Sequence, residues 1–196
     1  IDGIPTDHPT LASLLKGVGY DTALIRKWHC GYLPWFSPTR VGWDEFFGNF
    51  YHLNAEEEPE NVDYPKDPKF KERFGPRGVF HCYATDTVST LPDDGRFGKW
   101  GKQRCEDTGP LTRKRMETVD EEVLNETTKF IDTQTQAGKP WFVWFNTTRM
   151  HIFTHLKPAS VGKTGLGIYA DGMVEHDGMV GQLLKKLDDL GIADNT

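Results

Sequence analysis

Two basic side chains lie two positions apart in the segment Lys27-Trp28-His29, directly after an apolar stretch at residues 20–25. In an extended chain, residues two apart point to the same side, so Lys27 and His29 are expected to project together. An ammonium beside an imidazole suits an anionic group, because the lysine supplies a fixed charge and the histidine a transferable proton. From these residues alone, two solvated basic side chains at a strand end remain the simpler explanation.

A second histidine has a comparable position. His151 comes shortly after the apolar run at residues 141–146, which places another proton-bearing side chain beyond the carboxyl end of a predicted strand. His155 lies four residues later, a spacing that brings two histidines together on a helix. Phe153 and Pro158 argue against a helix here, so a metal site at His151 and His155 is the minor alternative.

The first elements that must position these side chains are a helix and a strand. The helix is expected to begin at Pro9 and to stop at the glycines in positions 17 and 19. Its apolar face consists of Leu11, Leu14, Leu15 and Val18. A helix that leads directly into an apolar strand at residues 20–25 indicates an α/β layer with a parallel sheet. Ligands bind such sheets at the carboxyl ends of the strands, where Lys27 and His29 fall.

The later elements are a helix, a strand and a further helix. A capping box of Thr118 and Glu121 is expected to begin the helix, and Gly138 to end it. The strand at 141–146 is a continuous apolar run, which is typical of a strand covered on both faces. The last helix spans about 169–190, and His176 on it is expected to be structural or exposed. The residues expected to face inward from this helix are Met173, Val180, Leu184 and Leu187.

Residues 31–109 show neither a helical nor a strand period. Prolines interrupt this segment, but its many aromatic side chains argue against disorder because they need burial. We therefore expect an irregular, ordered, aromatic-rich excursion at about 31–109, packed over one end of the sheet. Cys82 and Cys105 can pair if the protein is exported, although unpaired thiols are the simpler expectation. With Cys30 they form no C-x-x-C pair, so no structural zinc site is expected.

The whole-chain properties narrow the class of protein. The chain has 196 residues, a length that predicts one domain. Its net charge is −6 and it has no stripe of basic residues, so no nucleic-acid partner is expected. No apolar run reaches the roughly 18 residues of a membrane span, so no membrane association is expected. The first residues lack the basic and apolar regions of a signal peptide. The chain begins without Met and no strand follows its last helix, which predicts an internal piece of a longer protein.

Four ordered segments of the chain match one known family. Residues 14–29 (LLKGVGYDTALIRKWH) match its helix–strand segment ending in G-K-W-H, and residues 42–48 (GWDEFFG) match its GFDEFFG stretch. Residues 139–145 (KPWFVWF) with His151 match its KPFFLY…PH segment. Residues 169–177 (YADGMVEHD) and 187–196 (LDDLGIADNT) match its YADMVEEMD…LDELGLADNT helix. The chain thus resembles the type I sulfatases (arylsulfatases) of the alkaline phosphatase superfamily, least clearly at residues 54–109.

This resemblance implies an alkaline-phosphatase-like α/β sandwich, with a mostly parallel central sheet and helices on both faces. Residues 1–196 would be part of a single sulfatase catalytic domain in a hydrolase that cleaves sulfate monoesters of an aryl or carbohydrate substrate. The family pattern assigns sulfate contact to Lys27, support of the nucleophile to His29, and sulfate binding or leaving-group protonation to His151. His151 is preferred to His155 because its distance from Pro140 matches the family spacing.

The resemblance also implies components that residues 1–196 do not contain. The family's nucleophile is a formylglycine made from Cys or Ser in a C/S-x-P-x-R motif, and Ser37-Pro38-Thr39-Arg40 has the wrong spacing. The paired Asp and the D-N-G motif that bind Ca2+ or Mg2+ are absent too, so the metal ligands and the formylglycine are expected outside this chain. Arg26 stands where Gly is usual, and Cys30 where Leu is usual. On its own, this chain is expected to be an inactive fragment.

Two other functions stay open. A phosphodiesterase or phosphonate hydrolase of the same superfamily is one, because sulfate and phosphate esters need similar charge. A non-catalytic protein that binds sulfated glycans through Lys27, His29 and the aromatics of residues 35–51 is the other. The resemblance implies a small-molecule or carbohydrate sulfate ester as partner and a periplasmic, secreted or lysosomal location. It leaves the oligomeric state open.

Overall fold

The computed structural model describes residues 3–5, 7–31 and 33–196. A five-stranded sheet with strand order β4-β3-β2-β1-β5 forms its centre. The strands are β1 (Asp21–Ile25), β2 (Glu45–Gly48), β3 (Phe80–Ala84), β4 (Gln103–Asp107) and β5 (Trp141–Phe145). The helices are α1 (Leu11–Gly17), α2 (Leu53–Glu57), α3 (Pro68–Phe74), α4 (Arg113–Met116), α5 (Val119–Gln136) and α6 (Ile168–Asp189). The short 3-10 turns are η1 (Pro34–Phe36), η2 (Pro38–Arg40), η3 (Glu58–Glu60) and η4 (Ala193–Asn195).

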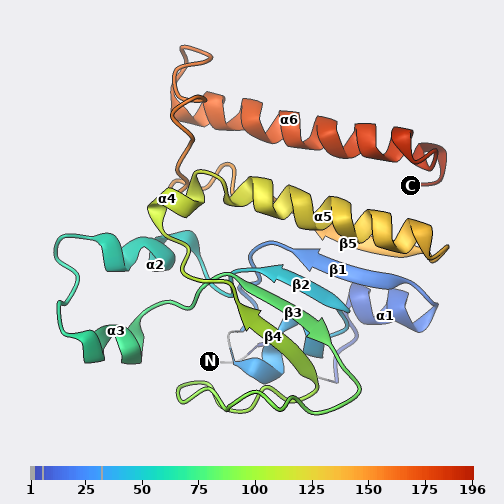
Figure 1. Ribbon diagram of the computed structural model, residues 1–196, viewed down its shortest axis with the longest axis horizontal. Helices are drawn as coiled ribbons and strands as arrows, with labels where there is room; N and C mark the ends of the chain where they lie inside the picture. Colours follow the sequence, from blue (N-terminus) through green and yellow to red (C-terminus); the bar gives the residue numbers. More distant parts are fainter. Residues whose placement is uncertain (1–2, 6, 32) are drawn as a thin grey trace.

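The sheet is mixed. β1 pairs in parallel with both β2 and β5, whereas the β2–β3 and β3–β4 pairs are antiparallel. The parallel part, β2-β1-β5, contains the strands that the sequence predicts around Lys27 and His151. Its carboxyl ends therefore meet at one edge of the sheet, and β1 points toward α2 and α4 in Figure 1.

Alternate residues of the central strands face opposite layers, as the pleat of a strand requires. On one face, Leu24 shares a core cluster with Ala12 of α1. On the other face, Ile25 packs with Val123 and Phe130 of α5. Helices thus cover both faces of the sheet, with α5 and α1 on opposite sides (Figure 1). None of the helices in the described part of the chain has the length and apolar character that a membrane span requires.

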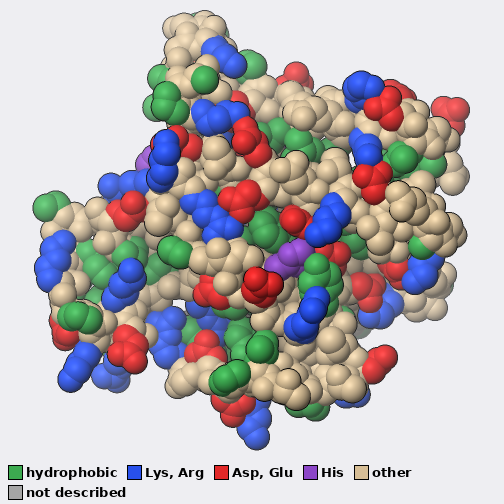
Figure 2. Space-filling model, viewed as in Figure 1, with side chains coloured by type: hydrophobic (Ala, Val, Ile, Leu, Met, Phe, Trp, Pro, Cys, Tyr) green, Lys and Arg blue, Asp and Glu red, His purple; other side chains and the backbone are tan. Residues whose placement is uncertain are grey.

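Helix α6 lies over α5 and not on the sheet (Figure 1). Lys186 of α6 forms an ion pair with Asp132 of α5 at 2.6 Å, and Figure 2 shows acidic and basic side chains intermingled on this face. Because α6 has only this one neighbouring helix, the predicted inward residues Met173 and Leu184 are 40% and 58% exposed, which is a correction. Met179 is the buried apolar side chain of α6.

Three further details of the elements differ from expectation. On α1, the predicted apolar face is exposed at Leu11, Leu14 and Val18, because so short a helix covers the sheet with Ala12. Strand β5 lies at the edge of the sheet, and Trp144 is 48% exposed, so the strand is not covered on both faces. Thr118 is the N-cap of α5 but makes no side-chain capping bond, so the predicted capping box does not form.

The segment at 31–109 is more regular than its sequence indicates. It contains the strands β2, β3 and β4 and the helices α2 and α3, so the expectation of an irregular excursion is corrected. These strands extend the sheet sideways by antiparallel pairing, and their short lengths of four or five residues leave little periodicity to detect. Beyond the sheet, α2 and α3 project past the end toward which β1 points (Figure 1).

A disulfide joins two neighbouring strands of this segment. Cys82 of β3 lies directly opposite Cys105 of β4 in the antiparallel ladder, with Cα atoms 4.1 Å apart, and the two are bonded. The expectation of unpaired thiols is therefore wrong for these two residues, because their pairing depends on a strand register that the sequence does not reveal. Cys30 is free and exposed.

Removal of the disulfide should lower stability measurably. Replacing Cys82 and Cys105 together by Ser should lower the free energy of unfolding by about 3 kcal/mol, because the cross-link restricts the unfolded chain. Cys30→Ser is the matched control and should change it by less than about 0.5 kcal/mol, since its thiol is exposed. Urea unfolding of the three proteins gives the comparison. Equal stability of all three would contradict a bond between Cys82 and Cys105.

Candidate active site

The segment Lys27-Trp28-His29 continues beyond β1 and is held by the chain that follows β2. The backbone N–H of Trp28 donates to the carbonyl of Asn49 at 3.0 Å, and that of His29 to the carbonyl of Phe50 at 2.9 Å. The indole N–H of Trp28 donates to the carbonyl of Phe36 at 2.8 Å. These bonds fix the backbone on both sides of the indole, so the basic side chains start from a rigid support.

Two backbone conformations shape the turn at this point. His29 has a φ of 56°, in the left-handed region that non-glycine residues adopt rarely and at some cost. Gly48, at the end of β2, packs so closely on the chain after β1 that a Cβ would lie 2.0 Å from the carbonyl oxygen of Arg26. The close approach of β1 and β2 therefore requires glycine at position 48.

Two rings lie against His29. The Tyr51 ring centroid lies 4.7 Å from that of His29, and the His52 centroid lies 5.5 Å away. His52 is also the N-cap of α2, where its Nδ1 accepts from the backbone N–H of Ala55 at 3.3 Å. An acceptor role for Nδ1 leaves the proton of the neutral ring on Nε2. Sequence reasoning missed His52, although its position shortly after the strand parallel to β1 is a signal that could have indicated it.

His151 lies in a tight turn after β5. Its backbone N–H donates to the carbonyl of Thr148 at 2.8 Å, and its carbonyl accepts from Thr154 at 3.0 Å. Its Nδ1 accepts from the backbone N–H of Phe153 at 3.2 Å. As in His52, this bond leaves the proton of the neutral imidazole on Nε2.

Burial and neighbouring positive charges lower the pKa values of Lys27, His29 and His151. Partial burial, followed by the charges of Lys27, Arg26 and His52, lowers the pKa of His151. Partial burial, followed by Lys27 and His52, lowers the pKa of His29. Partial burial and then the Arg26 charge lower the pKa of Lys27. The structure thus brings Lys27 within electrostatic reach of both His29 and His151, and the lowered pKa values favour the neutral form of both imidazoles. This cluster of donors suits an anion.

Arg26 adds a second fixed charge that the sequence did not assign to the site. Burial lowers the pKa of its guanidinium, and the nearby carboxylate of Asp120 offsets this effect only in part. Its Nε is buried without a hydrogen-bond partner among the described residues. Arg26 therefore contributes positive potential at the carboxyl end of β1, where the resemblance leads one to expect glycine.

A buried ion pair fixes the turn that carries His151. Arg149 Nη1 lies 3.0 Å from Asp120 Oδ2, and Nη2 lies 2.6 Å from Glu175 Oε2. The side chains of Arg149 and Asp120 are 1% and 0% exposed. Thr148 donates its backbone N–H and its hydroxyl to Asp120 at 2.7 and 2.9 Å. Breaking a buried ion pair is strongly destabilising, so this network holds the start of α5, α6 and the chain next to His151 together.

The other histidines in question have structural partners. His155 Nε2 lies 2.6 Å from Glu57 Oε2 and so links the loop after β5 to α2. This ion pair, and the absence of a helix at residues 151–157, argue against a metal site formed by His151 and His155. His176 Nδ1 lies 2.9 Å from the hydroxyl of Thr147, which joins α6 to the same loop, in line with the structural role expected for it.

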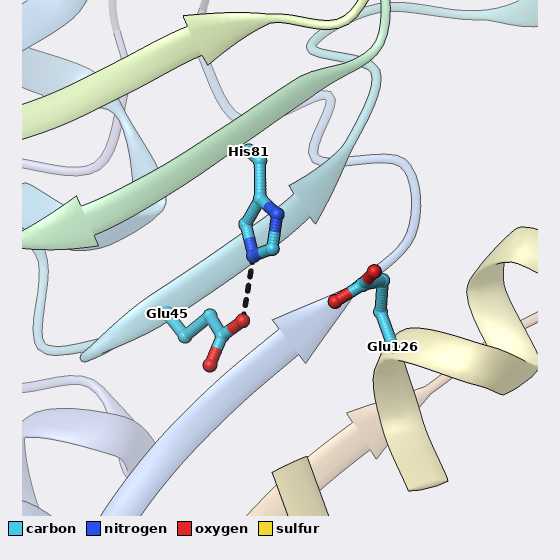
Figure 3. Close-up of side chains that lie close together, drawn as sticks. All are labelled: Glu45, His81 and Glu126. Atoms are coloured by element: carbon cyan, nitrogen blue, oxygen red, sulfur yellow. Dashed lines mark hydrogen bonds and ion pairs between the residues drawn. The ribbon is translucent and has the colours of Figure 1, made fainter. Parts of the chain in front are cut away.

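The residues around Lys27 do not fit Ca2+ or Mg2+, because these cations prefer oxygen ligands whereas the side chains of Lys27, His29 and His151 offer nitrogen. Within the described residues, one group of three potential metal ligands was found, consisting of Glu45, His81 and Glu126 (Figure 3). His81 Nε2 lies 2.6 Å from Glu45 Oε1, and Glu126 lies 3.5 Å from the ammonium of Lys129. These contacts account for the three side chains without a metal. They come from β2, β3 and α5, whereas Lys27 and His151 follow β1 and β5.

Comparison with known proteins identifies the family. Residues 1–196 match the family model described as Sulfatase. The chain belongs to the sulfatase family. Sulfatases in general depend on a metal and a formylglycine residue, and they are hydrolases.

Two curated sulfatases illustrate the relationship. N-acetylgalactosamine-6-sulfatase of Canis lupus familiaris is 28% identical over 197 residues, which are 100% of this chain and 32% of that protein. Arylsulfatase G of Homo sapiens is 26% identical over 191 residues, which are 96% of this chain and 34% of that protein. The chain therefore spans about a third of the length of these relatives.

Solved structures of sulfatases share the fold. The PsFucS1 sulfatase from Pseudoalteromonas sp. aligns with a TM-score of 0.75 at 23% identity and covers 97% of this chain and 37% of that one. A structure described with the metabolism of glycosaminoglycans by Bacteroides thetaiotaomicron aligns at 0.65 and 20% identity, covering 98% of this sulfatase chain and 44% of that one. The alkaline-phosphatase-like α/β fold implied by the sequence resemblance is thus confirmed.

The charge of Lys27 should be visible in the titration of the two neighbouring imidazoles. Lys27→Met removes a cation that lowers the pKa of His29 and His151, so both pKa values should rise. Histidine signals followed by NMR across the pH range measure this. Lys16→Met, whose ammonium pairs with Asp44 instead, is the control and should shift neither. Unchanged pKa values in Lys27→Met would show that Lys27 does not face these rings.

Proposed function

We propose that the protein of which this sulfatase chain is part hydrolyses sulfate monoesters, with Lys27, His29 and His151 at its active site. The observation that supports this most directly is the electrostatic influence of Lys27 on both His29 and His151, which lie in segments that follow the parallel strands β1 and β5. A sulfate ester carries negative charge that fixed cations and N–H donors stabilise, more strongly where water is excluded.

Each residue has a role that its geometry suggests. The ammonium of Lys27 binds the sulfate oxygens, and the charge of Arg26 adds to the attractive potential. His29 supplies an imidazole beside Lys27, in the position that sulfatases use to support the nucleophile. His151 keeps its proton on Nε2, because Nδ1 accepts from Phe153. We assign it hydrogen-bond donation to the sulfate or to the leaving oxygen, since its lowered pKa keeps the ring neutral.

The remaining components would come from outside residues 1–196. The formylglycine would supply the nucleophile, and Ca2+ or Mg2+ would neutralise charge on it. The side chains of Lys27, His29 and His151 offer nitrogen and not the oxygen ligands that Ca2+ and Mg2+ prefer, so we place the metal ligands in other parts of the protein. On its own the 196-residue chain should show no turnover.

The substrates and the location follow from chemistry and relationship. Names of related proteins include N-acetylgalactosamine-6-sulfatase, and one structural neighbour is described with glycosaminoglycans, which supports a sulfated carbohydrate as substrate here. The disulfide between Cys82 and Cys105 supports an oxidising location, such as the periplasm, the lysosome or the exterior of the cell.

Activity of the full-length protein tests this function. With 4-nitrophenyl sulfate, Lys27→Ala should lower kcat/KM by about 100- to 1,000-fold, because a charged contact to the reacting group is lost. His151→Ala should lower it by about 100-fold. Lys185→Ala is the control, because its ammonium pairs with Asp189 at the exposed surface of α6, and it should leave kcat/KM unchanged.

Two outcomes would replace the proposal. Faster turnover of bis(4-nitrophenyl) phosphate than of the sulfate ester would indicate a phosphodiesterase. Binding of sulfated glycan without turnover of any ester, in protein shown by mass spectrometry to carry formylglycine, would indicate a binding protein.

A further inference from the structure

A cavity of about 420 Å3 lies beside the candidate active site, between α2, the end of α3 and the turn at residues 96–97. Tyr51 and His52 form part of its wall. The rings of both also lie against His29, at centroid distances of 4.7 and 5.5 Å. The cavity and the active site therefore share two side chains. Its volume falls in the range of about 300–1,000 Å3 that small-molecule sites occupy, and it exceeds what a sulfate group needs.

A buried carboxyl group in the wall of the cavity lacks a partner. Glu56 is 5% exposed, and its Oε2 has no hydrogen-bond partner among the described residues. Burial, with the charge of Asp107 as a smaller cause, raises the pKa of Glu56 to about 9, so the group is protonated at neutral pH. A protonated carboxyl both donates and accepts hydrogen bonds, as a sugar hydroxyl also does. Leaving such a group unpaired costs about 1–3 kcal/mol, which a bound hydroxyl would recover.

Two arginines supply positive charge to the same cavity. The guanidinium of Arg73 lies 5.1 Å from the ring centroid of Phe74, and that of Arg96 lies 4.6 Å from that of Phe97. Arg96 also donates to the carbonyl of Gly75 at 2.9 Å. Among the described residues, neither guanidinium is paired with a carboxylate. A guanidinium binds a carboxylate or sulfate through paired N–H donors, so both arginines suit an anionic substituent.

The other charged groups of the cavity partly offset this potential. Arg77 is balanced by Asp94 at 3.1 Å, and exposed Glu58 adds one negative charge at the wall. With Glu56 protonated, the sum over the cavity is still positive. The ring of Phe74 is 60% exposed and offers a flat apolar surface at the rim. Aromatic surface, donors and positive charge together match an acidic sugar better than a purely apolar ligand.

We propose that this cavity binds the sugar unit next to the sulfated one, that this neighbouring sugar carries a carboxylate or a second sulfate, and that Glu56 and Arg96 recognise it. The inference rests on the proposed sulfatase function and defines its substrate as an acidic sulfated oligosaccharide. Glu56 pairs with a hydroxyl of the neighbouring sugar, and Arg96 with its anionic group.

The test compares three substrates of the full-length protein. These are 4-nitrophenyl sulfate, a sulfated disaccharide with a neutral neighbouring sugar, and the same disaccharide with a uronic acid in that place. For each protein, kcat/KM for a disaccharide is divided by kcat/KM for the aryl sulfate. Arg96→Ala should lower this ratio for the uronate disaccharide by about 10- to 100-fold, because the charge-assisted hydrogen bonds of Arg96 to the carboxylate are lost. The corresponding ratio for the neutral disaccharide should change by less than about threefold.

Variants of Glu56 test the second contact. Glu56→Leu should lower both disaccharide ratios, whereas Glu56→Gln, which keeps a donor and an acceptor, should keep most of each. The matched control is Arg104→Ala, an arginine over the Tyr83 ring on β4, which should alter no ratio. Thermal melting shows whether each variant is folded. If folded Arg96→Ala and Glu56→Leu proteins keep the wild-type ratios, and the wild type shows no preference for the uronate, the proposal is overturned.

A binding measurement separates this inference from the proposed function. The unsulfated uronate disaccharide is titrated into the wild-type protein and into Arg96→Ala by calorimetry. If no ester is hydrolysed but the wild type binds and the variant binds at least about 10-fold more weakly, the sulfatase function fails and the sugar site stands. If sulfate esters are hydrolysed but the wild type neither binds this disaccharide nor prefers the uronate substrate, the sugar site fails alone.

Discussion

Arg149 joins three elements that are far apart in the sequence, and its guanidinium has almost no contact with solvent. It pairs with Asp120 in the first turn of α5 and with Glu175 of α6, while belonging itself to the loop after β5. Withdrawing these charges from water is costly, and the loss of either partner would leave a buried charge without compensation. The geometry is therefore specific: the loop can lie only where both carboxylates reach the arginine, and this fixes the turn that contains His151.

The parts of the site that the sequence predicts are those that depend on short-range rules. Lys27 and His29 follow a strand of consecutive apolar residues, and His151 follows another. Because parallel strands of one sheet end at one edge, their convergence is predictable without coordinates. The structure confirms the predicted bounds of the helices α5 and α6 and of the strands β1 and β5 to within one or two residues at either end.

The parts that the sequence does not predict depend on long-range pairing. The antiparallel strands β3 and β4 are short and follow prolines and glycines, so their register, and with it the Cys82–Cys105 bond, emerges only in three dimensions. His52 and Glu56 sit in a run of polar residues that reads as solvated chain, yet one ring reaches His29 and the Glu56 carboxyl is buried. Burial of a charged residue type contradicts its usual preference, which is why composition conceals such groups.

The close contact at Gly48 limits amino-acid substitution in the chain that follows β1 and β2, whereas the neighbouring helices α2 and α3 are not under this limit. Any side chain there would enter the carbonyl of Arg26, so the frame that presents Lys27 and His29 admits almost no diversification. Helices α2 and α3 project beyond that frame (Figure 1), and the chain just before α2 meets it through Tyr51 and His52. Such an arrangement behaves as a cassette: its charged and aromatic side chains can be exchanged during divergence, or by grafting in the laboratory, while the frame that carries Lys27 and His29 is inherited intact.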